Sequence, residues 1–130
     1  MKRPIIILIV LLLVVTLPLA AQKYWPKEKF TEIYFNNPEK LPKEIGYGTE
    51  YNLSFTIISH EKESAVYDYR INSEIVSREG QITLTPEKNQ TFDLTFKLEN
   101  KEYSKEGNVT VYLKNSETQR DIYFFYRIVK

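Results

Sequence analysis

The sequence has no cysteine, one histidine and three aspartates among its 130 residues. Without cysteine the chain forms no disulfide, thiolate metal site, cysteine nucleophile or lipid-anchored cysteine. A metal site needs several convergent ligands, and a general base needs a partner that orients it. The chain also lacks a calcium-loop pattern, a glycine-rich phosphate loop and a nucleophile elbow. These absences argue against a metal-dependent or nucleophilic enzyme, and no cofactor is expected.

The charge balance gives no excess of either sign beyond the first 21 residues. All 17 acidic residues and 16 of the 18 basic residues lie in the part of the chain that begins at Gln22. A nucleic-acid-binding domain needs a clear basic excess on one face. The sequence therefore predicts no nucleic-acid partner.

A hydrophobic segment opens the chain. Lys2 and Arg3 precede an uncharged apolar run, residues 5–17, which is typical of an export signal. One interpretation is a cleaved signal peptide, with Ala20 and Ala21 as the small residues before the cut. The other is an uncleaved anchor.

The anchor interpretation rests on length and on the flanking residues. Residues 4–21 give 18 positions, at the lower end of the ~17–25 residues needed to span the hydrocarbon core. Tyr24 and Trp25 follow where an aromatic belt lies in membrane proteins. Both interpretations predict that the chain beyond residue 22 is outside the cytoplasm. The expected location is the cell membrane, with a single pass, or the exterior after cleavage.

The remainder of the chain alternates apolar and polar residues with a period of two, the pattern of half-buried strands. We divide the chain into a signal segment (1–22), a linker (23–29) and an extracytoplasmic domain (30–130), with residues 36–48 as a long loop. The expected strands are 30–35, 49–59, 66–72, two short strands within 75–84 that meet near Gly80, 91–98, a strand after Gly107, and 120–129. Short strands with one apolar face each predict an all-β fold, an immunoglobulin-like antiparallel β-sandwich of about seven strands.

Several short motifs resemble a family of archaeal membrane proteins, the domain-of-unknown-function family 1616. They are the segment 30–35 followed by Pro38, the strand end at Ser59, His60 and Glu61 followed by Tyr67, and the terminal segment 121–126. The family has Asn where Ser59 stands here, and its members often carry several membrane helices. The resemblance implies an extracytoplasmic β-domain joined to the membrane. It implies no catalytic residue.

Three Asn-X-Ser/Thr sequons are candidate glycosylation sites. They lie at Asn52, Asn89 and Asn108. Asn52 and Asn108 fall on the outward phase of their strands, and Asn89 is expected in a turn. Ordinary polar residues on a solvated surface are the alternative.

His60, with Glu61 and Glu63 nearby, is the one place in the sequence where acid–base or metal chemistry is conceivable. The three residues fall at a strand end or turn, and no second histidine accompanies them. We interpret them as residues that shape and solvate the turn, and we expect no catalytic and no metal site.

The last two strands carry aromatic residues on the side that faces away from the core. If Val111 and Phe124 face inward, then Tyr112, Tyr123 and Phe125 face outward. An outward aromatic patch often marks a partner or ligand site. The alternative is a central strand covered on both faces, by the linker or by the 36–48 loop.

These observations favour a non-enzymatic, membrane-tethered interaction domain with a role in envelope structure or adhesion. The membrane, through the N-terminal segment, and another envelope or membrane protein or a surface glycan are the expected partners. A carbohydrate-binding module with exposed aromatic rings in one plane is the second hypothesis. A hydrolase with an Asp/Glu-based site is the third.

Overall fold

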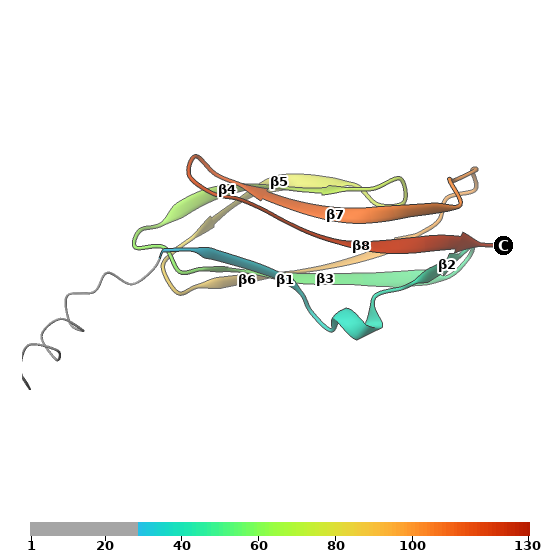
Figure 1. Ribbon diagram of the computed structural model, residues 1–130, viewed down its shortest axis with the longest axis horizontal. Helices are drawn as coiled ribbons and strands as arrows, with labels where there is room; N and C mark the ends of the chain where they lie inside the picture. Colours follow the sequence, from blue (N-terminus) through green and yellow to red (C-terminus); the bar gives the residue numbers. More distant parts are fainter. Residues whose placement is uncertain (1–28) are drawn as a thin grey trace, which may run out of the picture.

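Alternating apolar residues form β-strands along the chain in the computed structural model, which describes residues 29–130 (Figure 1). The expected all-β class is confirmed. Within the described residues the elements are β1 (Thr31–Phe35), a 3-10 turn η1 (Pro38–Lys40), β2 (Glu44–Gly46), β3 (Glu50–Ser59), β4 (Ala65–Asn72), β5 (Arg78–Leu84), β6 (Asn89–Lys97), β7 (Glu106–Lys114) and β8 (Gln119–Val129).

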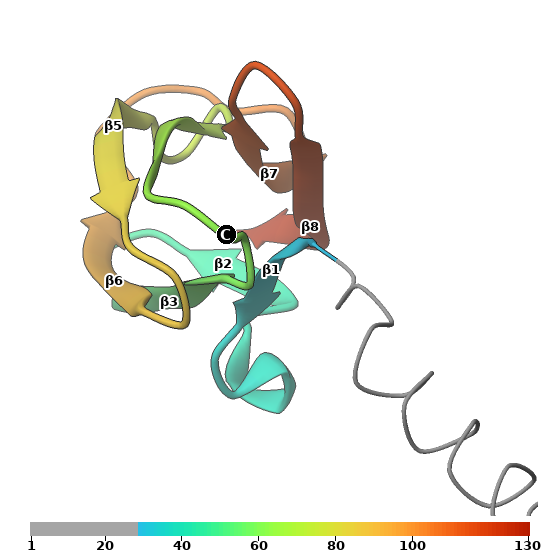
Figure 2. The ribbon, with the colours of Figure 1, turned by 90° about the vertical axis from the view of Figure 1, so that its left-hand side faces the viewer.

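The strands form two sheets stacked face to face, as the side view and the end-on view both show (Figures 1 and 2). The three-stranded sheet has the order β1-β3-β6, and the five-stranded sheet has the order β2-β8-β7-β4-β5. All pairs are antiparallel except β2 with β8, which is parallel. This is an immunoglobulin-like type of β-sandwich, as the sequence predicts.

The core lies between the sheets and is built from the inward phase of each strand. Phe55 and Phe92 stack with ring centroids 4.9 Å apart, and Phe35 meets Phe124 edge-on across the sandwich at 5.5 Å. Such aromatic pairs add stabilisation beyond the area that they bury. The largest fully buried side chains are those of Tyr67, Phe55, Ile45, Leu53, Ile57, Ile71 and Leu113.

Two expectations about the strands are wrong. The segment 75–84 contains one strand, β5 (Arg78–Leu84), and not two strands meeting at Gly80. Gly80 lies inside β5 opposite Tyr69, and a β-carbon added there would lie 2.8–2.9 Å from the Tyr69 ring. The glycine makes room for an aromatic side chain from the neighbouring strand, so it does not mark a turn.

The segment expected to be a loop, residues 36–48, contains strand β2. Ile45 of this strand is fully buried, and β2 pairs over three residues with the end of β8. A strand of three residues has too few positions to show a period, which is why the sequence pattern does not indicate it.

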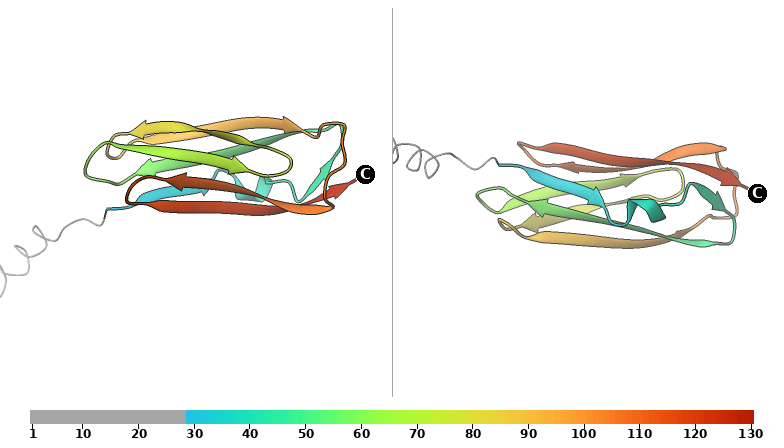
Figure 3. Two further views of the ribbon diagram at one scale, coloured as in Figure 1. Left: turned by 90° about the horizontal axis from the view of Figure 1, so that it is seen from above. Right: turned by 60° about the horizontal axis from the view of Figure 1, so that its bottom comes forward.

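The start of β1 and the C-terminal end of β8 lie at opposite ends of the long axis (Figures 1 and 3). Among residues 29–130 there is no helix with the length and hydropathy needed to cross a membrane. The predicted signal or anchor segment (1–22) and residues 23–28 of the predicted linker lie outside the described residues.

Candidate functional site

The outer surface of the five-stranded sheet carries the aromatic residues singled out in the sequence. Val111, Phe124 and Tyr126 of β7 and β8 point into the core, so Tyr112, Tyr123 and Phe125 point outward. Their exposed fractions are 39% for Tyr112, 56% for Tyr123 and 70% for Phe125. The outward orientation is confirmed, and the 36–48 segment does not bury them. We call these three residues the aromatic face.

The two most exposed rings lie side by side on β8. The ring centroids of Tyr123 and Phe125 are 5.4 Å apart, and the ring planes meet at 74°. Across the ladder on β7, Phe125 pairs with Asn108 and Tyr123 pairs with Thr110. The aromatic face is thus held on two neighbouring strands that are paired in one ladder.

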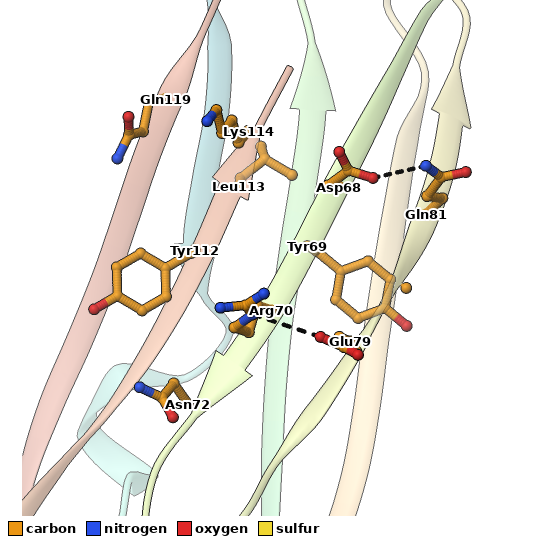
Figure 4. Close-up of a pocket in the computed structure, with 11 residues that line it drawn as sticks. Asp68, Tyr69, Arg70, Asn72, Glu79, Gln81, Tyr112, Leu113, Lys114 and Gln119 are labelled. Atoms are coloured by element: carbon orange, nitrogen blue, oxygen red, sulfur yellow. Dashed lines mark hydrogen bonds and ion pairs between the residues drawn. The ribbon is translucent and has the colours of Figure 1, made fainter. Parts of the chain in front are cut away.

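An open groove with a volume of about 680 Å³ continues the aromatic face onto β4 and β5 (Figure 4). Tyr112 and Lys114 border it on the β7 side. Its floor carries two pairs across β4 and β5: Arg70 Nε lies 3.5 Å from Glu79 Oε2, and Gln81 Nε2 donates to Asp68 Oδ1 at 2.8 Å. Most of these groups are exposed, so the groove is polar, solvated and nearly balanced in charge.

The groove is the part of the site that the sequence reasoning missed. The alternation in 66–72 does place Asp68 and Arg70 on the outward side of their strand. Their partners, however, depend on the β4–β5 register, in which Asp68 pairs with Gln81 and Arg70 with Glu79. With 75–84 interpreted as two strands, that register is not available from the sequence.

His60 lies at the end of β3, close to where β1 begins, and both of its ring nitrogens have carboxylate partners. Nε2 lies 3.2 Å from Glu32 Oε2, and Nδ1 lies 3.1 Å from Glu87 Oε2. The ring also packs on Phe30, with centroids 4.4 Å apart. The hydrogen bond to Glu32 raises the pKa of His60 above 6.5; partial burial opposes this, and Glu87 adds to it.

This arrangement predicts a pH-dependent stability. The folded pKa of His60 is above the unfolded value of about 6.5, so its stabilising contribution is complete below that pH and is lost as the pH rises through the folded pKa. We expect the difference in thermal midpoint between the wild type and His60→Gln to decrease as the pH rises from about 6 to about 8.5. This pH range lies above the one in which exposed carboxylates titrate. Thermal unfolding across that range tests this, and an unchanged difference between the two proteins contradicts it.

The residues next to His60 have structural roles. The buried Tyr67 hydroxyl lies 2.8 Å from Thr31 Oγ1 and 3.4 Å from Ser59 Oγ, and Thr31 also donates to Glu61 Oε1 at 3.3 Å. Glu63 is exposed. His60, Glu61 and Glu63 therefore do not converge on a common point. No group of three or more metal-ligating side chains was found within residues 29–130.

All three sequon asparagines are exposed. Asn52 lies on β3 with Thr95 as its neighbour on β6, and Asn89 is the first residue of β6, opposite Ile58, rather than part of a turn. Asn108 lies on β7 opposite Phe125, and its amide donates to Thr110 Oγ1 at 3.2 Å. The structure thus places one sequon asparagine, Asn108, next to the aromatic face and the other two on the three-stranded sheet.

Comparison with known proteins gives a likeness in fold alone. No family model and no curated protein sequence matches the chain. Among solved structures, the CARDB domain of a Pyrococcus furiosus protein, determined in complex with di-metal ions, is similar with a TM-score of 0.54 and 9% identity over 78% of this chain and 88% of that chain. A β-glucosidase from Listeria innocua matches 81% of this chain with 16% identity and a TM-score of 0.44, and the match spans 17% of the enzyme's length. The chain is therefore similar in fold to that CARDB domain.

Proposed function

We propose that the protein is a non-enzymatic, membrane-tethered domain that binds another envelope or membrane protein through the aromatic face and the adjoining groove. The observation that carries this proposal is the exposure of Tyr123 and Phe125, at 56% and 70%, on the rigid outer surface of a sheet. Large apolar side chains exposed next to one another are characteristic of interaction sites. The expected relation to family 1616 belongs to the same proposal.

The chemistry of the face suits recognition of a protein. Aromatic residues and arginine contribute most to protein–protein binding, and here Tyr112 of the aromatic face is the cross-strand neighbour of Arg70. The ion pair between Arg70 and Glu79 is exposed, so a partner can exchange it for its own polar contacts at little cost.

The position of the face in the domain fits a tethered binding module. The chain enters the domain at the end where β1 begins, and β8 runs from that end to the opposite one (Figure 1). Phe125 is the seventh of the eleven residues of β8, just past the middle of the strand. A domain anchored through its N-terminal segment would hold the Phe125 end of the aromatic face away from the membrane. A partner could then approach this end without contacting lipid.

The carbohydrate-binding alternative needs exposed rings that share a plane. Tyr123 and Phe125 meet at 74°, so this pair gives no flat platform for an extended saccharide chain. One ring can still hold one sugar unit. The geometry therefore favours a protein partner over a polysaccharide ligand.

Site-specific photo-crosslinking in membranes of the source cells tests the proposal. A photoreactive amino acid replaces Tyr123 in one variant and Tyr34 in the other. Tyr34 is the matched control because it is an exposed tyrosine, 39% accessible, on a strand of the three-stranded sheet. We expect a discrete crosslinked protein from position 123 that is absent from position 34, and at least tenfold less of it when Phe125→Ser is added.

The outcomes separate the parts of the proposal. Equal crosslinking from both positions means that the aromatic face is not the contact. Recovery of the chain in the cytoplasmic fraction, measured on the same samples, contradicts the tethered location. Undiminished crosslinking with Phe125→Ser excludes that ring from the binding site.

A further inference from the structure

Asn108 is the one sequon asparagine of the described residues that has an exposed aromatic ring as its direct cross-strand neighbour. It pairs with Phe125 in the β7–β8 ladder, and side chains in such a pair have β-carbons about 4.5–5.5 Å apart. Asn52 pairs with Thr95, and Asn89 pairs with Ile58, which is half-buried. The three sequons are thus similar in sequence and different in surroundings.

The surface around Asn108 is also hollowed. An open depression of about 710 Å³ is lined by Asn108 and Phe125, together with Glu106 and Arg127, which form an exposed ion pair at 3.5 Å. A second, smaller depression of about 270 Å³ lies on the other side of Asn108 and reaches Tyr112. A group attached to the Asn108 amide would have space on both sides and an aromatic ring next to it.

We propose that Asn108 carries an N-linked glycan whose first sugar packs on the Phe125 ring. The apolar C–H edge of a pyranose is weakly positive and the face of an aromatic ring is negative, so the two attract each other while the sugar hydroxyls remain in water. Phe125, at 70% exposure, offers that ring face, and Arg127 and Glu106 offer polar groups at the rim. The occupant of this end of the aromatic face is therefore part of the molecule itself.

The modification needs one co-reactant, a lipid-phosphate-linked saccharide. The Asn108 amide nitrogen forms a bond to the anomeric carbon of the sugar, and the bond from that carbon to the phosphate oxygen breaks. The lipid phosphate leaves with the bonding electrons, and a base of the transferase takes the amide proton. Asn108 and Thr110 supply the amide and the hydroxyl of the acceptor motif.

This inference rests on the proposed function, because N-linked sugars are added to exported chains, and it adds regulation of the same face. A sugar over Phe125 covers the end of the aromatic face that the unmodified chain exposes most. Partner binding through Phe125 would then belong to the chains that lack the sugar, so the modification would regulate how many chains can bind the partner.

Peptide mass mapping of the full chain purified from its source cells is the first test. We expect the peptide that contains Asn108 to carry a saccharide mass. An exported chain with unmodified Asn108 overturns the inference and leaves the proposed function in place. A chain found in the cytoplasm overturns both.

A set of four proteins tests the packing: wild type, Asn108→Gln, Phe125→Ala and the double variant, all from the source cells. Loss of the sugar through Asn108→Gln should lower the thermal midpoint by about 4 °C with Phe125 present, the shift typical of a modest change in stability. With Phe125→Ala already in place, the further shift should be less than about 1 °C. Equal shifts in both backgrounds overturn the packing of the sugar on Phe125.

Two controls keep the result specific. Asn52→Gln removes the sequon on the other sheet, where the neighbour is Thr95, and its shift should not depend on Phe125. When the same four proteins come from a host without N-glycosylation, the shift in thermal midpoint caused by Asn108→Gln should be the same with and without Phe125→Ala. A dependence that persists in that host means that the bare side chains cause it, and this also overturns the inference.

Discussion

Replacing Tyr67 with alanine is expected to remove a large part of the stability of the domain. Tyr67 is a fully buried side chain of the core, and its hydroxyl lies within hydrogen-bond reach of Thr31 and Ser59. Deleting a buried aromatic ring costs about 3–5 kcal/mol, against a total stability of about 5–15 kcal/mol for ordinary domains. Urea unfolding followed by far-ultraviolet circular dichroism measures the change in the free energy of unfolding.

A second variant, Tyr67→Phe, separates the hydroxyl from the ring. It keeps the packing and leaves Ser59 Oγ with the Glu61 backbone amide, at 3.4 Å, as its neighbour, while Thr31 Oγ1 keeps Glu61 Oε1 at 3.3 Å. Because both partners keep another hydrogen bond, the loss should be that of one net hydrogen bond, about 0.5–1.5 kcal/mol. Tyr34→Phe is the control, because an exposed hydroxyl should contribute within about 0.5 kcal/mol. A Tyr67→Phe protein as stable as the control would contradict the role of this hydrogen-bonded cluster.

Gly107→Ala is expected to destabilise the domain by about 1–3 kcal/mol, the usual range for overpacking a filled core. A β-carbon at Gly107 would lie 2.5 Å from Tyr126 Oη and 2.8 Å from Tyr126 Cζ. Tyr126 is 4% exposed, so its ring has little room to move away. Denaturant unfolding of the variant measures the loss.

The control is another glycine in a strand, Gly46. The nearest atoms to an added β-carbon there are 3.9 Å away, so Gly46→Ala meets no obstacle. It should be neutral or stabilising by up to about 1 kcal/mol, because alanine restricts the unfolded chain. Adding Tyr126→Phe to Gly107→Ala removes the closest atom and should restore part of the stability. If Gly107→Ala matches Gly46→Ala, the close approach of Tyr126 is not what requires a glycine.

The two glycines that lie under tyrosine rings explain a limit of sequence reasoning. Glu79 and Gly80 together have the composition of a turn, and the sequence pattern therefore predicts a break in 75–84. In the structure Gly80 faces Tyr69 across the ladder, as Gly107 faces Tyr126. A glycine that makes room for a ring is indistinguishable from a turn glycine until the partner strand is known.

Period-two alternation by itself determined most of the fold. It gave the all-β class, and it predicted β1, β3, β4, β6, β7 and β8 to within a few residues. A strand that is buried on one face has an apolar residue at every second position, because successive side chains point to opposite faces. The same alternation placed Tyr112, Tyr123 and Phe125 outward, since their neighbours Val111 and Phe124 are clearly apolar. These are local properties of the chain.

Tertiary structure alone decided which strands lie next to one another, and therefore the site. Phe125 lies opposite Asn108, 17 residues away in the chain, and Arg70 pairs with Glu79, 9 residues away. The partners of His60 are Glu87 and Glu32, which are 27 and 28 residues away. Register and sheet order depend on the packing of the whole core, and no local pattern encodes them. The sequence therefore determined which face of each strand is exposed, and the folded chain decided that a sequon asparagine, an aromatic pair and a polar groove share one surface.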